Sequence, residues 1–128
     1  MMREVEVVEA FSAALRADGW DVHTEVDFVD VVAERGDWTL YAEAKGTTSS
    51  PGLDVDTMYG QLLRRMPADE RPGVRWAAVV PEHVLPAVLR VPASVRARLV
   101  IDVYSVSSEG QVMLSSAADD GAWSPPGS

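Results

Sequence analysis

The chain has 128 residues, of which 47% are hydrophobic and none is cysteine, so disulfide frameworks and thiolate metal sites are excluded. Its formal net charge of −9 weighs against a broad basic surface of the kind that binds nucleic acid phosphates. No apolar run suits a signal peptide or a bilayer-spanning helix, so we expect a cytoplasmic protein without a membrane partner.

The chain begins with a segment of helical periodicity. Residues 3–20 place Val8, Phe11 and Leu15 on one face, as in an amphipathic helix that packs on a core. Gly19 follows the last apolar residue of this face, and glycine readily adopts the left-handed conformation that ends many helices. The pattern predicts one helix that ends near Gly19.

Three strands are predicted next. Residues 20–26 alternate polar and apolar side chains, which indicates a half-buried strand, and residues 28–33 are more apolar and indicate a more central one. Residues 38–45 follow a short turn centred on Arg35 and Gly36. The third strand should therefore pair with the second in an antiparallel hairpin.

The remaining segments complete an α/β pattern. They are a polar loop over residues 46–55, a helix over 56–66 with Asp56 as its N-cap, strands over 74–81, 100–106 and 111–115, and two short helices within 82–99 that Pro92 separates. The main order α-β-β-β-α-β-α-β predicts helices on both faces of a central mixed sheet. We expect one domain over residues 1–115 and a flexible C-terminal tail over 116–128.

Two acids and a lysine interrupt the apolar hairpin. Asp30 is a single acid in an apolar strand, and an ionised carboxylate there is costly unless it is paired or binds a metal. Glu43 and Lys45 share a face of the next strand; taken alone, they could be an exposed ion pair of little energetic value. The predicted turn sets Asp30 opposite Tyr41 and Phe28 opposite Glu43, so the two carboxylates become diagonal neighbours.

Two carboxylates at that spacing can converge on one hard cation. Mg²⁺ takes one or two carboxylates and fills its other positions with water and phosphate oxygens. A lysine beside them can hold the attacking water or neutralise charge that develops on phosphorus. Acid, acid and lysine on two paired strands are therefore typical of a metal-dependent phosphodiesterase.

The stretch "DVVAERGDWTLYAEAK" resembles the motif of the PD-(D/E)XK nuclease superfamily, which includes restriction endonuclease-like and Holliday-junction-resolvase-like proteins. The resemblance covers roughly residues 3–106 and implies a three-layer α/β/α fold with the element order given above. Val29 stands where the motif's proline would be, and Ala44 fills the slot between Glu43 and Lys45.

The resemblance also implies roles for single residues. Asp30 and Glu43, with the Ala44 carbonyl, would bind Mg²⁺, for which Mn²⁺ would substitute. Lys45 would orient the attacking water and stabilise the transition state. Gln61, on the following helix, would position water or the DNA backbone.

Five further residues are weaker candidates. Glu9 is the best candidate for an additional acid on the first helix, although its spacing is one residue off the family's. Tyr41 either lines the cleft or covers the core, and Thr47 lies where a loop can touch the substrate. Arg64 and Arg65 either contact phosphates or belong to a solvated helix face.

Other classes of site find less support. His23 and His83 have no partner at metal-ligand spacing, so a zinc site is not expected. The loop after Lys45 has no Gly-x-x-x-x-Gly-Lys-Ser/Thr pattern, which excludes a nucleoside triphosphate loop.

The sequence therefore predicts a small Mg²⁺-dependent DNA endonuclease. A catalytically silent binding or scaffold module on the same fold is the alternative, which the net charge of −9 favours. Because little lies outside the superfamily core, we expect a homodimer or a subunit of a larger defence, repair or mobile-element complex.

Overall fold

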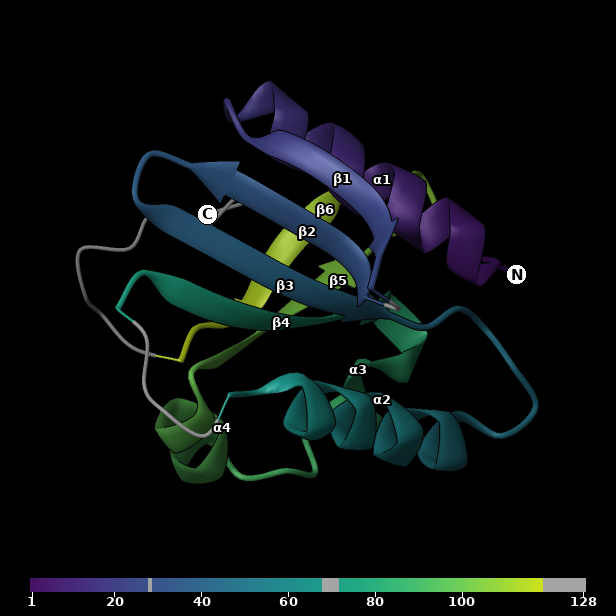
Figure 1. Cartoon of the computed structure of the whole chain (residues 1–128). Coiled ribbons are helices and arrows are strands. Elements are labelled where there is room, and N and C mark those ends of the chain that lie inside the picture. The colour runs from purple at the N-terminus through teal and green to yellow at the C-terminus, as the bar shows by residue number, and fades with distance from the viewer. Residues whose placement is uncertain (28, 68–71, 119–128) are drawn as a thin grey trace.

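A six-stranded mixed sheet forms the centre of the computed structural model, which describes residues 1–27, 29–67 and 72–118 (Figure 1). In chain order the elements are α1 (Glu4–Ala17), β1 (Asp21–Val26), β2 (Val29–Arg35), β3 (Trp38–Ala44), α2 (Pro51–Arg65), β4 (Val74–Pro81), the 3₁₀ turn η1 (Glu82–Val84), α3 (Leu85–Val88), α4 (Ala93–Leu99), β5 (Ile101–Val106) and β6 (Val112–Ser116). The predicted α/β class is confirmed.

The strands lie in chain order across the sheet, from β1 to β6. The β1–β2, β2–β3 and β5–β6 pairs are antiparallel, whereas β3–β4 and β4–β5 are parallel, so the predicted mixed sheet is confirmed. Helix α1 covers one face, and α2, α3 and α4 lie on the other (Figure 1). No helix in the described ranges is both long and apolar enough to cross a membrane.

Helix α1 buries a slightly different face from the predicted one. Val7, Phe11 and Leu15 are fully buried against the sheet, whereas Val8 is only partly buried. The predicted end is confirmed, because Gly19 has φ +85° and the Trp20 N–H donates to the Leu15 carbonyl at 3.0 Å. The helix therefore ends sharply, and the chain turns directly into the edge strand β1.

Helix α2 begins five residues before the predicted start. The predicted loop over residues 46–55 with Asp56 as N-cap is wrong, because the helix begins at Pro51. Proline is favoured in the first helical turn, where its missing N–H has no intrahelical partner. Val55, in the added turn, is buried against the sheet. Burial of Val55 thus outweighs the loop-like composition of this stretch.

The β2–β3 hairpin has a two-residue turn. Arg35 pairs with Trp38, so Gly36 and Asp37 form the turn. Gly36 has φ +58°, the left-handed conformation that tight hairpin turns require and that glycine adopts without a steric penalty. The predicted turn centred on Arg35 and Gly36 was therefore placed one residue too early.

This turn shifts the strand register by two residues. Tyr41 pairs with Val32 rather than with Asp30. Continued to the end of β2, the observed register sets Asp30 directly opposite Glu43, so their predicted diagonal relation is wrong. Phe28, the expected partner of Glu43, lies outside the described residues. The correction brings the two acids closer, because opposite residues of an antiparallel pair have Cα atoms only about 5 Å apart.

The C-terminal end of the described chain remains part of the sheet. Strand β6 includes Ser116, and the buried Ala118 donates its N–H to an Asp102 carboxylate oxygen at 2.7 Å. The rest of the predicted tail, residues 119–128, lies outside the described residues.

Candidate active site

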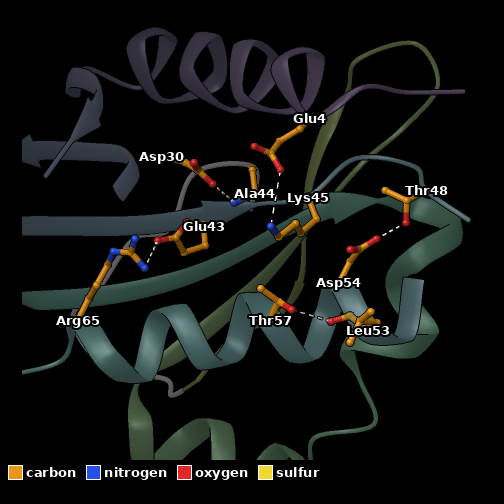
Figure 2. A network of polar contacts seen from close by, with 10 residues as sticks. All are labelled: Glu4, Asp30, Glu43, Ala44, Lys45, Thr48, Leu53, Asp54, Thr57 and Arg65. Carbon is orange, nitrogen blue, oxygen red and sulfur yellow. Dashed lines mark hydrogen bonds and ion pairs between the residues drawn. The ribbon is translucent and has the colours of Figure 1, made fainter. Parts of the chain in front are cut away.

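Asp30 and Glu43 meet where β2 and β3 pair. Asp30 is half-buried, and its Oδ2 accepts a hydrogen bond from the Ala44 N–H at 2.8 Å (Figure 2). Glu43 is only 2% exposed, and besides burial the Asp30 carboxyl is one of the causes that raise its pKa. The Asp30 side chain thus extends the pairing of β2 with β3 beyond the backbone ladder and places its carboxyl near Glu43.

The environment of Glu43 favours its protonated form. Burial raises the pKa of Glu43 to about 8, and the hydrogen bond and negative charge of Asp30 act in the same direction. The positive charges of Arg65 and Lys45 lower this pKa in part. Two carboxylates in contact cannot both stay ionised cheaply, so the pair needs a proton or a cation between them.

Arg65 supplies one positive charge. Its Nη1 lies 2.9 Å from Glu43 Oε1, and the same nitrogen donates to the Gln61 carbonyl at 3.1 Å (Figure 2). The Arg65 side chain is 20% exposed. The solvated helix face proposed for Arg65 is therefore wrong, because burial of Glu43 draws the guanidinium inward as a counter-charge.

Lys45 lies between α1 and α2 at the end of β3. Its Nζ is 3.9 Å from Glu4 Oε1 on α1, and its side chain is 20% exposed (Figure 2). Burial and the neighbouring charge of Asp30 raise the pKa of Glu4, while Lys45 opposes that rise. The lysine is therefore held near Asp30 and Glu43 by an acid of a different element.

Gln61 occupies the α2 turn that precedes Arg65. Its Oε1 is buried and accepts no hydrogen bond from the described protein atoms. A buried amide oxygen without a partner is costly, and a bound water is a common way to satisfy it. This oxygen is the feature at Gln61 that fits the predicted role of holding water.

Glu9 lines a groove that also reaches Asp30. The groove has a volume of about 490 Å³ and lies between α1 and the β1–β2 edge, with Glu4 at its border. Glu9 is exposed, and Glu4 rather than Glu9 pairs with Lys45. Glu4 was missed by sequence reasoning, because its approach depends on a loop contact that no local pattern encodes.

The weaker candidates separate into several environments. Tyr41 stacks on Trp76 with ring centroids 4.8 Å apart, and Arg64 is exposed on α2. Thr47 connects the loop after β3 to two other segments: its N–H donates to the Met2 carbonyl at 2.7 Å, and its Oγ1 lies 3.2 Å from His83 Nε2. His83 is exposed.

The donor set suits a cation that keeps much of its water shell. Within the described ranges, no group of three or more His, Asp or Glu side chains is arranged to hold a metal ion. Asp30 and Glu43 offer two carboxylates, which is the number that Mg²⁺ commonly takes from a protein. The pKa of Glu43 is raised mainly by burial and further by Asp30, so without a cation the neutral form of Glu43 is favoured at this pair.

Gly46 allows the first turn of α1 to approach Lys45. A Cβ atom at this position would lie 2.4 Å from the Glu4 nitrogen and 2.7 Å from the Met2 oxygen, both of them backbone atoms. We expect Gly46→Ala to destabilise the protein by about 1–3 kcal/mol in urea denaturation, because the start of α1 must move away.

Gly52→Ala is the matched control for this prediction. Gly52 lies in α2, and an added Cβ would meet its nearest atom, the Arg90 Nη1, at 3.9 Å. Because alanine is favoured over glycine in helices by about 1 kcal/mol, this change should be neutral or stabilising. Equal stability of both variants would contradict the close approach at Gly46.

Comparison with known proteins gives structural matches alone. No family model matches the chain, and no curated protein matches it. The chain resembles the crystal structure of an XisH family protein from Nostoc punctiforme, with a TM-score of 0.56 and 20% identity over 81% of this chain and 92% of that one. It also resembles an fdxN element excision controlling factor protein from Anabaena variabilis, with a TM-score of 0.59 and 21% identity over 82% of this chain and 92% of that one. At these identities the matches show a shared fold and leave the activity open.

Proposed function

We propose that this protein is a metal-dependent DNA endonuclease of the restriction endonuclease-like type. The observation that carries the proposal is the β2–β3 register, extended by the hydrogen bond from the Ala44 N–H to Asp30, which sets Asp30 beside Glu43, two residues before Lys45. This constellation is the one that the PD-(D/E)XK resemblance implies. Buried paired carboxylates next to an ammonium are costly for a purely structural purpose.

Each residue of the site has a separate role in the proposed reaction. Asp30, Glu43 and the Ala44 carbonyl would hold Mg²⁺, which when bound supplies a water of lowered pKa and neutralises charge on the phosphate. Lys45 places a positive charge where the phosphate gains negative charge in the transition state. The unpartnered Gln61 Oε1 accepts a hydrogen bond from a water and so helps to orient it.

The structural neighbours are compatible with this proposal. One of them is named as an excision controlling factor, and control of excision suits either a nuclease or a regulatory subunit. Because each match spans 92% of the neighbour's chain, the similarity extends over nearly all of that fold.

The direct test is hydrolysis of DNA by the purified protein. With Mg²⁺ or Mn²⁺ we expect nicks or cuts in single-stranded, duplex or branched DNA, and no product in EDTA. Absence of product with every one of these substrates, from a folded protein at low salt, would count against catalysis.

A catalytically silent binding module is the second candidate. The ion pair between Arg65 and Glu43 favours it, because the guanidinium already neutralises a carboxylate that a metal would need. The net charge of −9 also favours it, since such a surface repels phosphates. Metal binding separates the candidates: a catalytic site should bind Mn²⁺, observed by electron paramagnetic resonance, and Asp30→Ala should remove that binding.

The protein is also proposed to act as a homodimer or as a subunit of a larger complex. The support is that the described residues form one sheet with its covering helices, which leaves a small surface for a nucleic acid. Sedimentation should reveal a dimer at micromolar concentration or a co-purifying partner. A persistent monomer without a partner would argue against this part of the proposal.

Stability should depend on pH through Glu43. Its folded pKa of about 8 exceeds the ordinary value of 4.5, so between these pH values the folded state holds a proton that the unfolded state releases. The contribution of Glu43 to the free energy of unfolding is therefore fully present below about pH 4.5 and is lost as the pH rises through about 8. We expect a loss of at most about 5 kcal/mol, since one pKa unit corresponds to about 1.4 kcal/mol and the value of about 8 already includes the opposing charges of Arg65 and Lys45.

Glu43→Gln provides the comparison for this prediction. Urea denaturation of both proteins in EDTA from pH 5 to pH 9 should show that the wild type loses its advantage over the variant as the pH rises. Parallel stability curves would show that Glu43 does not hold a proton in the folded state.

A further inference from the structure

A second cavity lies on the α2 side of the sheet, next to the candidate active site. It has a volume of about 270 Å³, and its lining includes Tyr41, Trp76, Val74, Pro67, Arg65 and Asp27. The Tyr41 and Trp76 rings are stacked at 24° between their planes, and both contribute to the wall. Trp76 is 7% exposed and Tyr41 is half-buried, so the rings are fixed by packing.

The cavity and the active site share two elements. Tyr41 precedes Glu43 by two residues on β3, which is about 7 Å along a strand and within the reach of one nucleotide. Arg65 lines the cavity and contacts Glu43 at 2.9 Å. A ligand in the cavity would therefore extend towards the carboxyl pair.

We infer that this cavity binds one unpaired nucleobase, so that the substrate is a nucleic acid with single-stranded or extruded bases. The inference rests on the proposed function for the class of ligand. Every base has a flat face that stacks on aromatic rings, and the cavity is lined by the Tyr41–Trp76 stack, to which a base would add one more ring. In a duplex both faces of a base are covered by its neighbours, so a base must leave the stack to enter such a pocket.

Polar groups at the cavity suit the rest of a nucleotide. Asp27 lines the cavity, and a carboxylate at this position would accept hydrogen bonds from base amino or imino groups. Arg65 adds a positive charge on the side of the cavity that faces Glu43. An apolar side chain of a protein partner would make no use of Asp27, so the observations favour a base.

Base stacking also reconciles the acidic composition with DNA binding. A protein of net charge −9 cannot draw its affinity from a broad basic surface. Stacking on aromatic rings is insensitive to charge and contributes affinity at each base that it holds. The protein should therefore prefer unpaired DNA to duplex DNA, because the duplex has a higher density of negative charge and presents no free base faces.

The test uses an oligonucleotide with 2-aminopurine, a base whose fluorescence falls when it stacks. In EDTA at low salt, the single strand should bind the wild-type protein with quenching, and the same sequence as a duplex should bind at least roughly tenfold more weakly. Tyr41→Leu should weaken binding of the single strand roughly tenfold and abolish quenching. Tyr41→Phe, which keeps the ring, should bind within about twofold of wild type.

A second variant tests the cavity in case Tyr41→Leu does not fold. Val74→Phe places a ring inside the cavity and should reduce binding of the single strand by a similar factor, with thermal melting used to confirm the fold. The inference is overturned if the wild type shows no quenching, if Tyr41→Leu binds as the wild type does, or if the duplex binds equally well. A cavity that serves a protein partner instead would give the first of these results.

Failure of this inference is distinguishable from failure of the proposed function. Quenching without Mg²⁺-dependent cleavage would support the base site and reject catalysis. Cleavage without quenching, and with full activity of Tyr41→Leu, would support the nuclease and reject the base site.

Discussion

If the proposed mechanism holds, Lys45→Ala should lower Mg²⁺-dependent hydrolysis of DNA by about 10²- to 10³-fold, because it removes the ammonium that this mechanism places at the developing charge. The fold should be nearly unaffected. The Lys45 side chain is 20% exposed, and its ion pair with Glu4 is long at 3.9 Å, so the loss of stability should stay below about 1 kcal/mol. Initial rates on a fluorescent oligonucleotide and urea denaturation measure the two quantities.

Arg98→Ala is the matched control for Lys45→Ala. Both variants change the net charge from −9 to −10, but Arg98 is exposed on α4, away from the end of β3. A general effect of charge on DNA binding would slow both variants equally. A specific role requires that Arg98→Ala stay within a few-fold of the wild-type rate while Lys45→Ala loses activity. Full activity of Lys45→Ala would remove the lysine from the mechanism.

The sequence predicted the elements better than their exact pairing. Apolar periodicity placed α1 and the strands because a buried face must repeat with the period of its element. The hairpin register depended on whether the two-residue turn consists of Arg35 and Gly36 or of Gly36 and Asp37. A glycine marks the turn position with positive φ, but Gly36 belongs to both possible turns, so it could not distinguish them in the sequence.

Contacts between distant elements could not be predicted from local patterns. The ion pair between Arg65 and Glu43 joins residues of α2 and β3, and that of Lys45 with Glu4 joins the end of β3 to α1. Each contact depends on how a helix packs on the sheet. The sequence could identify an acid that needs a partner, but it did not specify which cation would provide the pairing.

Asp102 is a second acid whose position within an apolar strand predicts a charged partner. Like Asp30, it is a single acid within an apolar strand, "VIDVYSV", and the cost of burial therefore predicts a partner for it as well. The structure places that partner on β4: Arg75 Nη2 lies 3.0 and 3.3 Å from the two Asp102 carboxylate oxygens. Asp102 is 0% and Arg75 is 3% exposed. This ion pair is more deeply buried than any at the candidate active site.

Asp102→Ala should destabilise the protein by about 3–5 kcal/mol, because it leaves the Arg75 guanidinium buried without its carboxylate. The Ala118 N–H also loses its acceptor. Urea denaturation at pH 7 measures the effect. A loss below about 1 kcal/mol would mean that water reaches Arg75 in the variant and that the pair is not enclosed as the structure indicates.

A double variant separates the cost of an isolated charge from the value of the pair. Arg75→Met with Asp102→Leu removes both charges and keeps the side chains large and apolar, so its stability should return to within about 1 kcal/mol of wild type. Asp102 lies near the start of β5, whereas Lys45 follows the end of β3, which runs parallel to β4 and β5. The pair and the candidate site therefore occupy opposite ends of the parallel strands. The double variant should therefore keep the wild-type level of the proposed DNA cleavage, because the buried pair lies away from the candidate site.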